Sequence, residues 1–250
     1  MEVTPQFIAK EEWLVYKTAM EASREAGVPF LVAGAFALGV YTGRWRSTKD
    51  IDLIVMPHHR AAIIQALENA GFEDFYAQTP YDRGWIYRST RGGYIVDVIW
   101  RMANRRSDVD AEWFDHAVNV RVGGTGFAVI PPVELLWHKL YVLQRDRCDW
   151  PDVLNLLYAA GDKLDWARLL RRAGPDARLL EAVMVVFEWM CPGRINALPG
   201  WLRERFHLEA QSPDAPEILP HRASLLDTRE WFDSVPEKHL PDHAQLFGRK

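Results

Sequence analysis

The chain has 250 residues, of which 48% are hydrophobic and 26% are charged, as is usual for a globular protein with a substantial core. Its 30 basic and 34 acidic residues give a formal net charge of −4, which argues against binding of nucleic acid through a generally basic surface. The cysteines Cys148 and Cys191 lack the spacing of a disulfide framework or a zinc site, so we expect a reducing, cytoplasmic location.

The sequence predicts neither a secretory signal nor a membrane span. The N-terminal residues carry charges where a signal peptide needs an apolar core. The longest apolar run, residues 26–41, is too short to cross a bilayer and is interrupted by Pro29 and three glycines. A strand, a tight turn and a short helix explain this run better, and we expect no membrane partner.

Residues 1–131 predict a small α/β unit with mixed strands. Apolar periodicity and glycine or proline breaks predict helices over residues 7–26, 35–43 and 58–70. Alternating or continuous apolar patterns predict strands over residues 29–33, 50–55, 72–77, 83–90, 94–100, 118–122 and 127–130. Glycine-rich turns join the last two pairs of strands as hairpins.

The pattern changes at Pro131 and Pro132, after which the chain is almost entirely helical in periodicity. Helices are predicted over residues 133–146, 151–161, 165–174 and 176–190, and this helical domain, residues 132–208, is followed by proline-rich residues 209–250. The expected fold class is therefore α+β: a small mixed-sheet domain (1–131), a helical domain (132–208) and an extended C-terminal arm (209–250).

Two carboxylates stand at the entrance of one predicted strand. Asp50 and Asp52 are two positions apart, so they point to the same face of the strand, where two like charges repel each other unless a cation lies nearby. Gly34, at the preceding turn from strand to helix, allows a phosphate to approach the free amides of the helix N-terminus. A divalent cation such as Mg²⁺ would relieve the repulsion and hold a triphosphate at this turn.

Asp97 offers a third carboxylate, because it is the one charge in the apolar strand "YIVDVIW". Burying it without a partner would cost several kcal/mol, so a partner is expected. Three carboxylates on neighbouring strands can hold two metal ions roughly 3.5–4 Å apart, as in-line nucleotidyl transfer requires. The alternatives for Asp97 are a solvated strand end or an ion pair with Arg101.

The stretch "LVAGAFALGVYTGRWRSTKDIDLIV" together with "YIVDVIW" resembles the nucleotidyltransferase superfamily, which has a polymerase-β-like fold. The motif of that superfamily is a glycine turn, a D-x-D about a dozen residues later and a distant third carboxylate. The resemblance is closest to the minimal bacterial and AbiEii-type branch, the abortive-infection toxins. There a helical second half carries a lysine and then an aspartate, which "ELLWHKLYVLQRDRCDWPDVLNLL" resembles with Lys139 and Asp149.

The resemblance implies roles for five catalytic residues. Asp50 and Asp52 would bind Mg²⁺ or Mn²⁺, and Asp97 would complete the site as a third metal ligand or a general base. Lys139 would contact the phosphates of the nucleotide, and Asp149 would position the acceptor or activate its hydroxyl. From the residues alone, Lys139 could instead extend its ammonium to solvent, and Asp149 could be the N-cap of the next helix.

The turn and the loop after it would bind the nucleotide. Gly34 and Ala35 would supply backbone amides, although the family has serine or glycine where this chain has Ala35, so a phosphate-binding hydroxyl is missing. Arg44, Arg46 and Lys49, in the loop "RWRSTK", can contact phosphate and stabilise charge in the transition state.

These features predict a metal-dependent nucleotidyltransferase that moves a nucleoside monophosphate from a nucleoside triphosphate to an acceptor hydroxyl and releases pyrophosphate. The acceptor is open among an RNA end, a small hydroxylated molecule and a protein side chain. Two alternatives stay open as well. Ala35 favours a nucleotide-binding regulator without turnover, and the carboxylates could be surface charge on a toxin–antitoxin-type interaction module.

Overall fold

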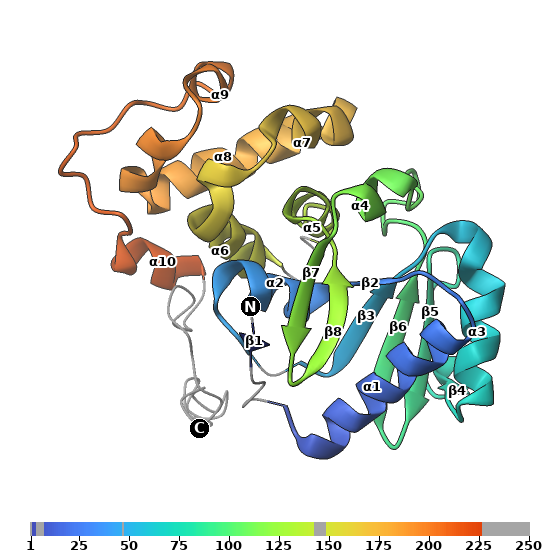
Figure 1. The fold of residues 1–250 in the computed structure, drawn as a ribbon. Helices are drawn as coiled ribbons and strands as arrows, with labels where there is room; N and C mark the ends of the chain where they lie inside the picture. Colours follow the sequence, from blue (N-terminus) through green and yellow to red (C-terminus); the bar gives the residue numbers. More distant parts are fainter. Residues whose placement is uncertain (1, 4–7, 47, 143–148, 227–250) are drawn as a thin grey trace, which may run out of the picture. The chain divides into compact units, whose positions relative to one another are not determined.

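The computed structural model describes residues 2–3, 8–46, 48–142 and 149–226 of the chain (Figure 1). Two compact units are present, each with its own core. The first comprises Met1–Gly39 and Trp45–Pro131, and the second comprises Val40–Arg44 and Pro132–Lys250. The predicted helix end at residues 143–146 and the last part of the predicted arm, residues 227–250, lie outside the described residues.

The first unit is built on a mixed sheet of eight strands in the order β1-β7-β8-β2-β3-β6-β5-β4. Its strands are β1 (Glu2–Val3), β2 (Leu31–Val32), β3 (Asp50–Ile54), β4 (Glu73–Asp74), β5 (Ile86–Arg91), β6 (Tyr94–Ile99), β7 (Val118–Val122) and β8 (Thr125–Val129). Its helices are α1 (Lys10–Glu25), α2 (Gly34–Thr42, which runs on into the second unit), α3 (Arg60–Asn69) and α4 (Ala111–Asp115).

The centre of the sheet is the parallel pair β3 and β6, and α1 and α3 pack together against β6 (Figure 1). Ile51 and Leu53 of β3 and Val96 and Val98 of β6 are fully buried. Because side chains alternate along a strand, the aspartates between these residues point to the opposite face. The register therefore places polar side chains from two strands on one face of the sheet.

The second unit is helical. Its helices are α5 (Pro132–Lys139), α6 (Trp150–Ala160), α7 (Trp166–Ala173), α8 (Ala177–Met190), α9 (Gly200–Arg205) and α10 (Pro220–Leu226). Leucine, methionine and phenylalanine side chains fill the core. Within this core Glu134 of α5 is fully buried and accepts hydrogen bonds from Arg168 (2.9 Å) and Arg172 (3.3 Å) of α7, which balance its charge.

Three predicted elements differ in the structure. The predicted strand 72–77 stops at Asp74, because the Asp74 carboxylate accepts a hydrogen bond from the Tyr76 amide (2.8 Å) and starts a 3₁₀ turn, Phe75–Ala77. The helix predicted over 133–146 ends at Lys139. A helix, α10, forms within the segment predicted to be an extended arm.

Two further expectations concern membranes and cysteines. Among the described residues, no helix is both long and apolar enough to span a bilayer. Cys191 is a buried free thiol, and burial raises its pKa to about 12, so it stays protonated at neutral pH. Cys148 lies outside the described residues.

Candidate active site

Gly34 brings the start of helix α2 directly against Asp52. The two chain segments are joined by a hydrogen bond from the Ala33 amide to the Asp52 carbonyl (2.9 Å). Gly34 has a φ of +57°, and a Cβ at this position would lie 1.9 Å from Asp52 Oδ2. The glycine is thus required both by its backbone conformation and by the carboxylate beside it. The sequence predicted a close approach at this turn, and the group that approaches in the structure is Asp52.

The three predicted carboxylates form a row across β3 and β6. In the parallel register Asp52 lies beside Asp97, and Asp50 lies two positions earlier on the same face. Asp50 accepts a hydrogen bond from the Thr48 hydroxyl (3.0 Å). Asp97 is almost completely buried, Asp52 is buried, and the side chain of Asp50 is 28% exposed. The prediction that Asp97 lies beside the first carboxylate strand is confirmed.

The cation found among these carboxylates is Arg88. Its Nε donates to Asp97 Oδ1 (2.8 Å) and its Nη2 to Asp97 Oδ2 (2.5 Å), while Nη2 also lies 4.0 Å from Asp50 Oδ2. The hydrogen bonds to Asp97 outweigh burial and raise the pKa of Arg88, and the charges of Asp50 and Asp52 add to the rise. Arg88 supplies the partner that a buried Asp97 needs, whereas Arg101, the alternative partner, pairs with Asp108.

Sequence reasoning missed Arg88, although a signal for it was present. The turn at Gly92 and Gly93 joins β5 to β6, and residues opposite each other across this hairpin follow from the turn position. Counting back from the pair Arg91 and Tyr94 puts Arg88 opposite Asp97, and cross-strand partners share a face of the sheet.

Metal binding by Asp50, Asp52 and Asp97 together stays a prediction. Among the described residues, no group of three or more His, Cys, Asp or Glu side chains is arranged to hold a metal ion. Asp97 is instead paired with Arg88. Asp50 and Asp52 nevertheless fit a hard divalent cation, since both offer carboxylate oxygens and Asp50 is open to solvent.

Lys139 and Asp149, predicted as catalytic, meet in the second unit together with Asp152. The Lys139 ammonium donates to Asp149 Oδ2 (2.9 Å) and to Asp152 Oδ2 (2.6 Å), and Lys139 is only 5% exposed. Burial by itself would lower the pKa of Lys139, but the two carboxylates raise it above its usual value, so the lysine is charged. Lys139 therefore does not extend to solvent. Asp149 stands at the N-cap of α6 without a capping hydrogen bond from its side chain.

The three cations of the predicted phosphate-binding loop belong to different units. Arg44 belongs to the second unit, where its guanidinium lies over the Tyr158 ring at 5.4 Å. Arg46 and Lys49 belong to the first unit, and Arg46 is partly buried while Lys49 is exposed. Ser47, in the same loop, lies outside the described residues. The binding roles of Arg44, Arg46 and Lys49 stay predictions.

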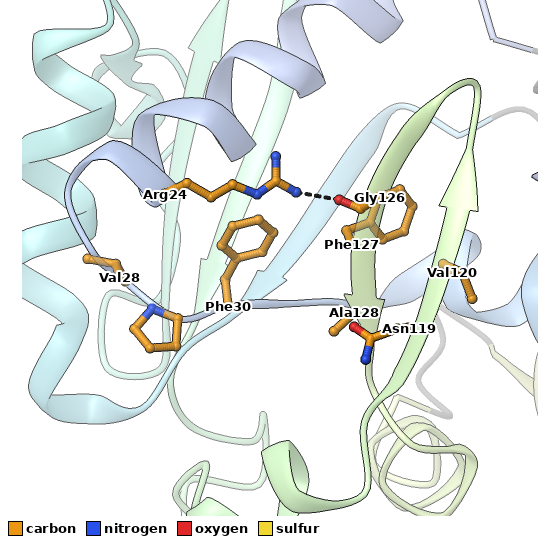
Figure 2. Close-up of a pocket in the computed structure, with 9 residues that line it drawn as sticks. Arg24, Val28, Phe30, Asn119, Val120, Gly126, Phe127 and Ala128 are labelled. Atoms are coloured by element: carbon orange, nitrogen blue, oxygen red, sulfur yellow. Dashed lines mark hydrogen bonds between the residues drawn. The ribbon is translucent and has the colours of Figure 1, made fainter.

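A cavity of about 400 Å³ lies elsewhere in the first unit (Figure 2). It is lined by Arg24, Val28, Pro29, Phe30, Asn119, Val120, Gly126, Phe127 and Ala128. Arg24 donates to the Gly126 carbonyl (2.6 Å) and lies over the Phe30 ring. Phe30 precedes β2 whereas Gly34 follows it, so the cavity and the carboxylates lie at opposite ends of this strand. No carboxylate lines it, and we assign it no chemistry.

The mixed sheet, the glycine turn and the row of carboxylates define a nucleotidyltransferase fold. Residues 21–185, more than half of the chain, match the family described as "Uncharacterised nucleotidyltransferase", and the chain belongs to this family. The superfamily resemblance is thereby confirmed, while the closer resemblance to the AbiEii-type branch stays a prediction. Among curated proteins, none matches the sequence.

Several solved structures are similar to this chain. The antibiotic-resistance factor ANT(2'')-Ia, in its solution structure, is 16% identical, with 68% of this chain and 94% of that chain covered and a TM-score of 0.50. The lincosamide antibiotic adenylyltransferase LnuA, bound to lincomycin, is 18% identical over 60% of this chain and 98% of that chain, with a TM-score of 0.43. JHP933 from Helicobacter pylori is 11% identical, with 88% of this chain and 98% of that chain covered and a TM-score of 0.39. At 16% identity, the likeness to ANT(2'')-Ia shows the fold alone.

Proposed function

We propose that the protein transfers a nucleoside monophosphate from a nucleoside triphosphate to an acceptor hydroxyl with the help of a divalent cation. The observation that carries the proposal is the contact between the Gly34 turn and Asp52, which joins a helix N-terminus to a carboxylate. The helix N-terminus attracts phosphate oxygens, and the carboxylates of Asp50 and Asp52 attract a cation that binds the same phosphate.

The residues of the chain have separate tasks in this proposal. Asp50 and Asp52 would hold Mg²⁺ or Mn²⁺. The bound cation would neutralise negative charge on the transferred phosphate. The amides at Gly34 and Ala35 would orient the phosphates, and Arg46 of the following loop would contact them. Ala35 has no hydroxyl, but its amide remains, so binding of phosphate by backbone is retained. Positioning and charge stabilisation would provide most of the rate enhancement.

The acceptor is a hydroxyl on an RNA end, a small molecule or a protein side chain. The predicted roles of Lys139 at the phosphates and of Asp149 at the acceptor stay predictions, since the contacts described for these residues are to each other and to Asp152. A nucleotide-binding regulator without turnover is the second candidate, because Ala35 replaces the residue that carries the phosphate-binding hydroxyl.

We expect a nucleoside triphosphate with Mg²⁺ or Mn²⁺ to stabilise the protein against heat. A ligand at about a hundred times its Kd adds roughly 2.7 kcal/mol to the free energy of unfolding. The measurement is a thermal-shift titration with ATP, GTP, CTP and UTP, each with and without the metal. The shift should require the metal and should disappear in Asp52→Asn.

The matched control is Asp108→Asn, an aspartate of the same unit that pairs with Arg101 at the surface. This variant should keep the full nucleotide shift. Absence of any shift in the folded wild-type protein would contradict the proposal and favour the interaction module. A metal-dependent shift without release of pyrophosphate, over a panel of acceptors, would favour the regulator.

A further inference from the structure

We propose that the guanidinium of Arg88 is a permanent positive charge of the carboxylate site. Its ion pair with Asp97 prevents Asp97 from acting as a metal ligand or a base. Asp50 and Asp52 alone then bind one divalent cation. This inference rests on the proposed function. It gives Arg88 the role of a positioning residue, which sets the charge and the metal count of the site.

The first argument is the geometry of the ion pair. The guanidinium meets Asp97 as a fork, with one nitrogen on each carboxylate oxygen, at 2.8 and 2.5 Å. This bidentate arrangement is the strongest that an arginine and a carboxylate can form. A divalent cation bound to either oxygen of Asp97 would lie within a few ångströms of the guanidinium and be repelled by it.

The second argument is the difference in solvent exposure between the side chains of Asp97, Arg88 and Asp50. The side chain of Asp97 is 1% exposed, whereas those of Arg88 and Asp50 are 27% and 28% exposed. A ligand that comes from solvent therefore meets Arg88 and Asp50 before Asp97. Arg88 Nη2 lies 4.0 Å from Asp50 Oδ2 and 2.5 Å from Asp97 Oδ2, so the guanidinium lies close to both carboxylates.

The third argument is charge balance. The guanidinium of Arg88 offsets one of the three carboxylate charges of Asp50, Asp52 and Asp97. Arg88 is electrostatically coupled to all three carboxylates, since each of them raises its pKa. Removing the charge of Arg88 should therefore increase the attraction of the site for metal ions, whereas loss of a purely structural residue would not.

The test is a Mn²⁺ titration in which free Mn²⁺ is followed by electron paramagnetic resonance, without nucleotide. The wild-type protein should bind one Mn²⁺, and Asp52→Asn should lose it. Arg88→Gln should bind Mn²⁺ about tenfold more tightly and take up a second ion, because Asp97 is released and a positive charge is gone. Mn²⁺ should also raise the melting temperature of Arg88→Gln more than that of the wild type.

The double variant Arg88→Gln with Asp97→Asn decides the role of Asp97. It replaces the ion pair by two amides of similar shape, so no unpaired charge is left in the sheet and the variant should fold. Because it removes one charge of each sign, Mn²⁺ affinity should stay within about threefold of the wild type. A loss of Mn²⁺ binding as complete as in Asp52→Asn would make Asp97 a ligand and overturn the inference.

Other outcomes separate this inference from the proposed function. Unchanged Mn²⁺ affinity in Arg88→Gln, or two Mn²⁺ ions in the wild type, overturns the inference while the nucleotide shift and the proposed function stand. A wild-type chain that binds no Mn²⁺ and shows no nucleotide shift overturns both. Circular dichroism of each variant confirms that the comparison is made between folded proteins.

Discussion

Replacement of Lys139 by methionine is expected to lower the free energy of unfolding by about 3–5 kcal/mol, because it removes the cation that pairs with the buried carboxylate of Asp152 and the partly buried carboxylate of Asp149. Lys139 donates to Asp149 and Asp152, and Asp152 is only 7% exposed. Methionine keeps the volume of the lysine stem, so loss of charge rather than loss of packing dominates the effect. Urea unfolding of both proteins at neutral pH measures the difference.

Lys163→Met is the matched control, since Lys163 is an exposed lysine of the same unit. It should change the stability by less than about 0.5 kcal/mol, as is usual for surface substitutions. If Lys139→Met and Lys163→Met behave alike, the ion cluster of Lys139 does not stabilise the fold. The variant Asp152→Asn should lie between them, because Asp149 still pairs with the lysine.

Substitution of Gly34 by alanine is the second change with a large expected effect. Alanine is strained at a φ of +57°, at a cost of roughly 1–3 kcal/mol, and its Cβ would lie 1.9 Å from Asp52 Oδ2. Asp52 or the start of α2 must therefore move. We expect a loss of stability beyond the backbone strain and loss of the metal-dependent nucleotide shift, both measured by thermal unfolding with and without ligand.

Gly27→Ala separates the two causes. Gly27 has a φ of +67°, but a Cβ there would meet nothing within 4 Å. This control should show the backbone strain alone and retain the nucleotide shift. A Gly34→Ala variant that binds nucleotide and metal as well as Gly27→Ala does would refute the arrangement proposed for Asp52.

The carboxylate strands show which features of the site can be predicted from the sequence alone. Alternation along "DIDLIV" puts Asp50 and Asp52 on one face, and one isolated charge in "YIVDVIW" marks Asp97 as a residue that needs a partner. These inferences depend only on the period of a strand and the cost of a buried charge. Both hold in the structure, where β3 and β6 pair in parallel with Asp52 beside Asp97.

Contacts between segments that are distant in the chain could not be predicted from the sequence. Lys139 lies ten positions before Asp149, and the sequence left open whether its ammonium reached a cleft or solvent. The structure gives a third arrangement, a buried ion cluster with Asp149 and Asp152. Which carboxylates surround a long flexible side chain depends on how helices pack, and no local periodicity reports it.

The sequence by itself determined the α+β class, the order of most strands and helices, and the three carboxylates of the site, because these follow from local periodicity, turn residues and the energetic cost of burial. The tertiary structure decided which charges pair. The need of Asp97 for a partner was visible in the sequence, and the hairpin turn also offered Arg88, but the ion pair itself was recognised only with β5 against β6 in the sheet. Ion pairing depends on distances of a few ångströms, and only the assembled sheet sets those distances.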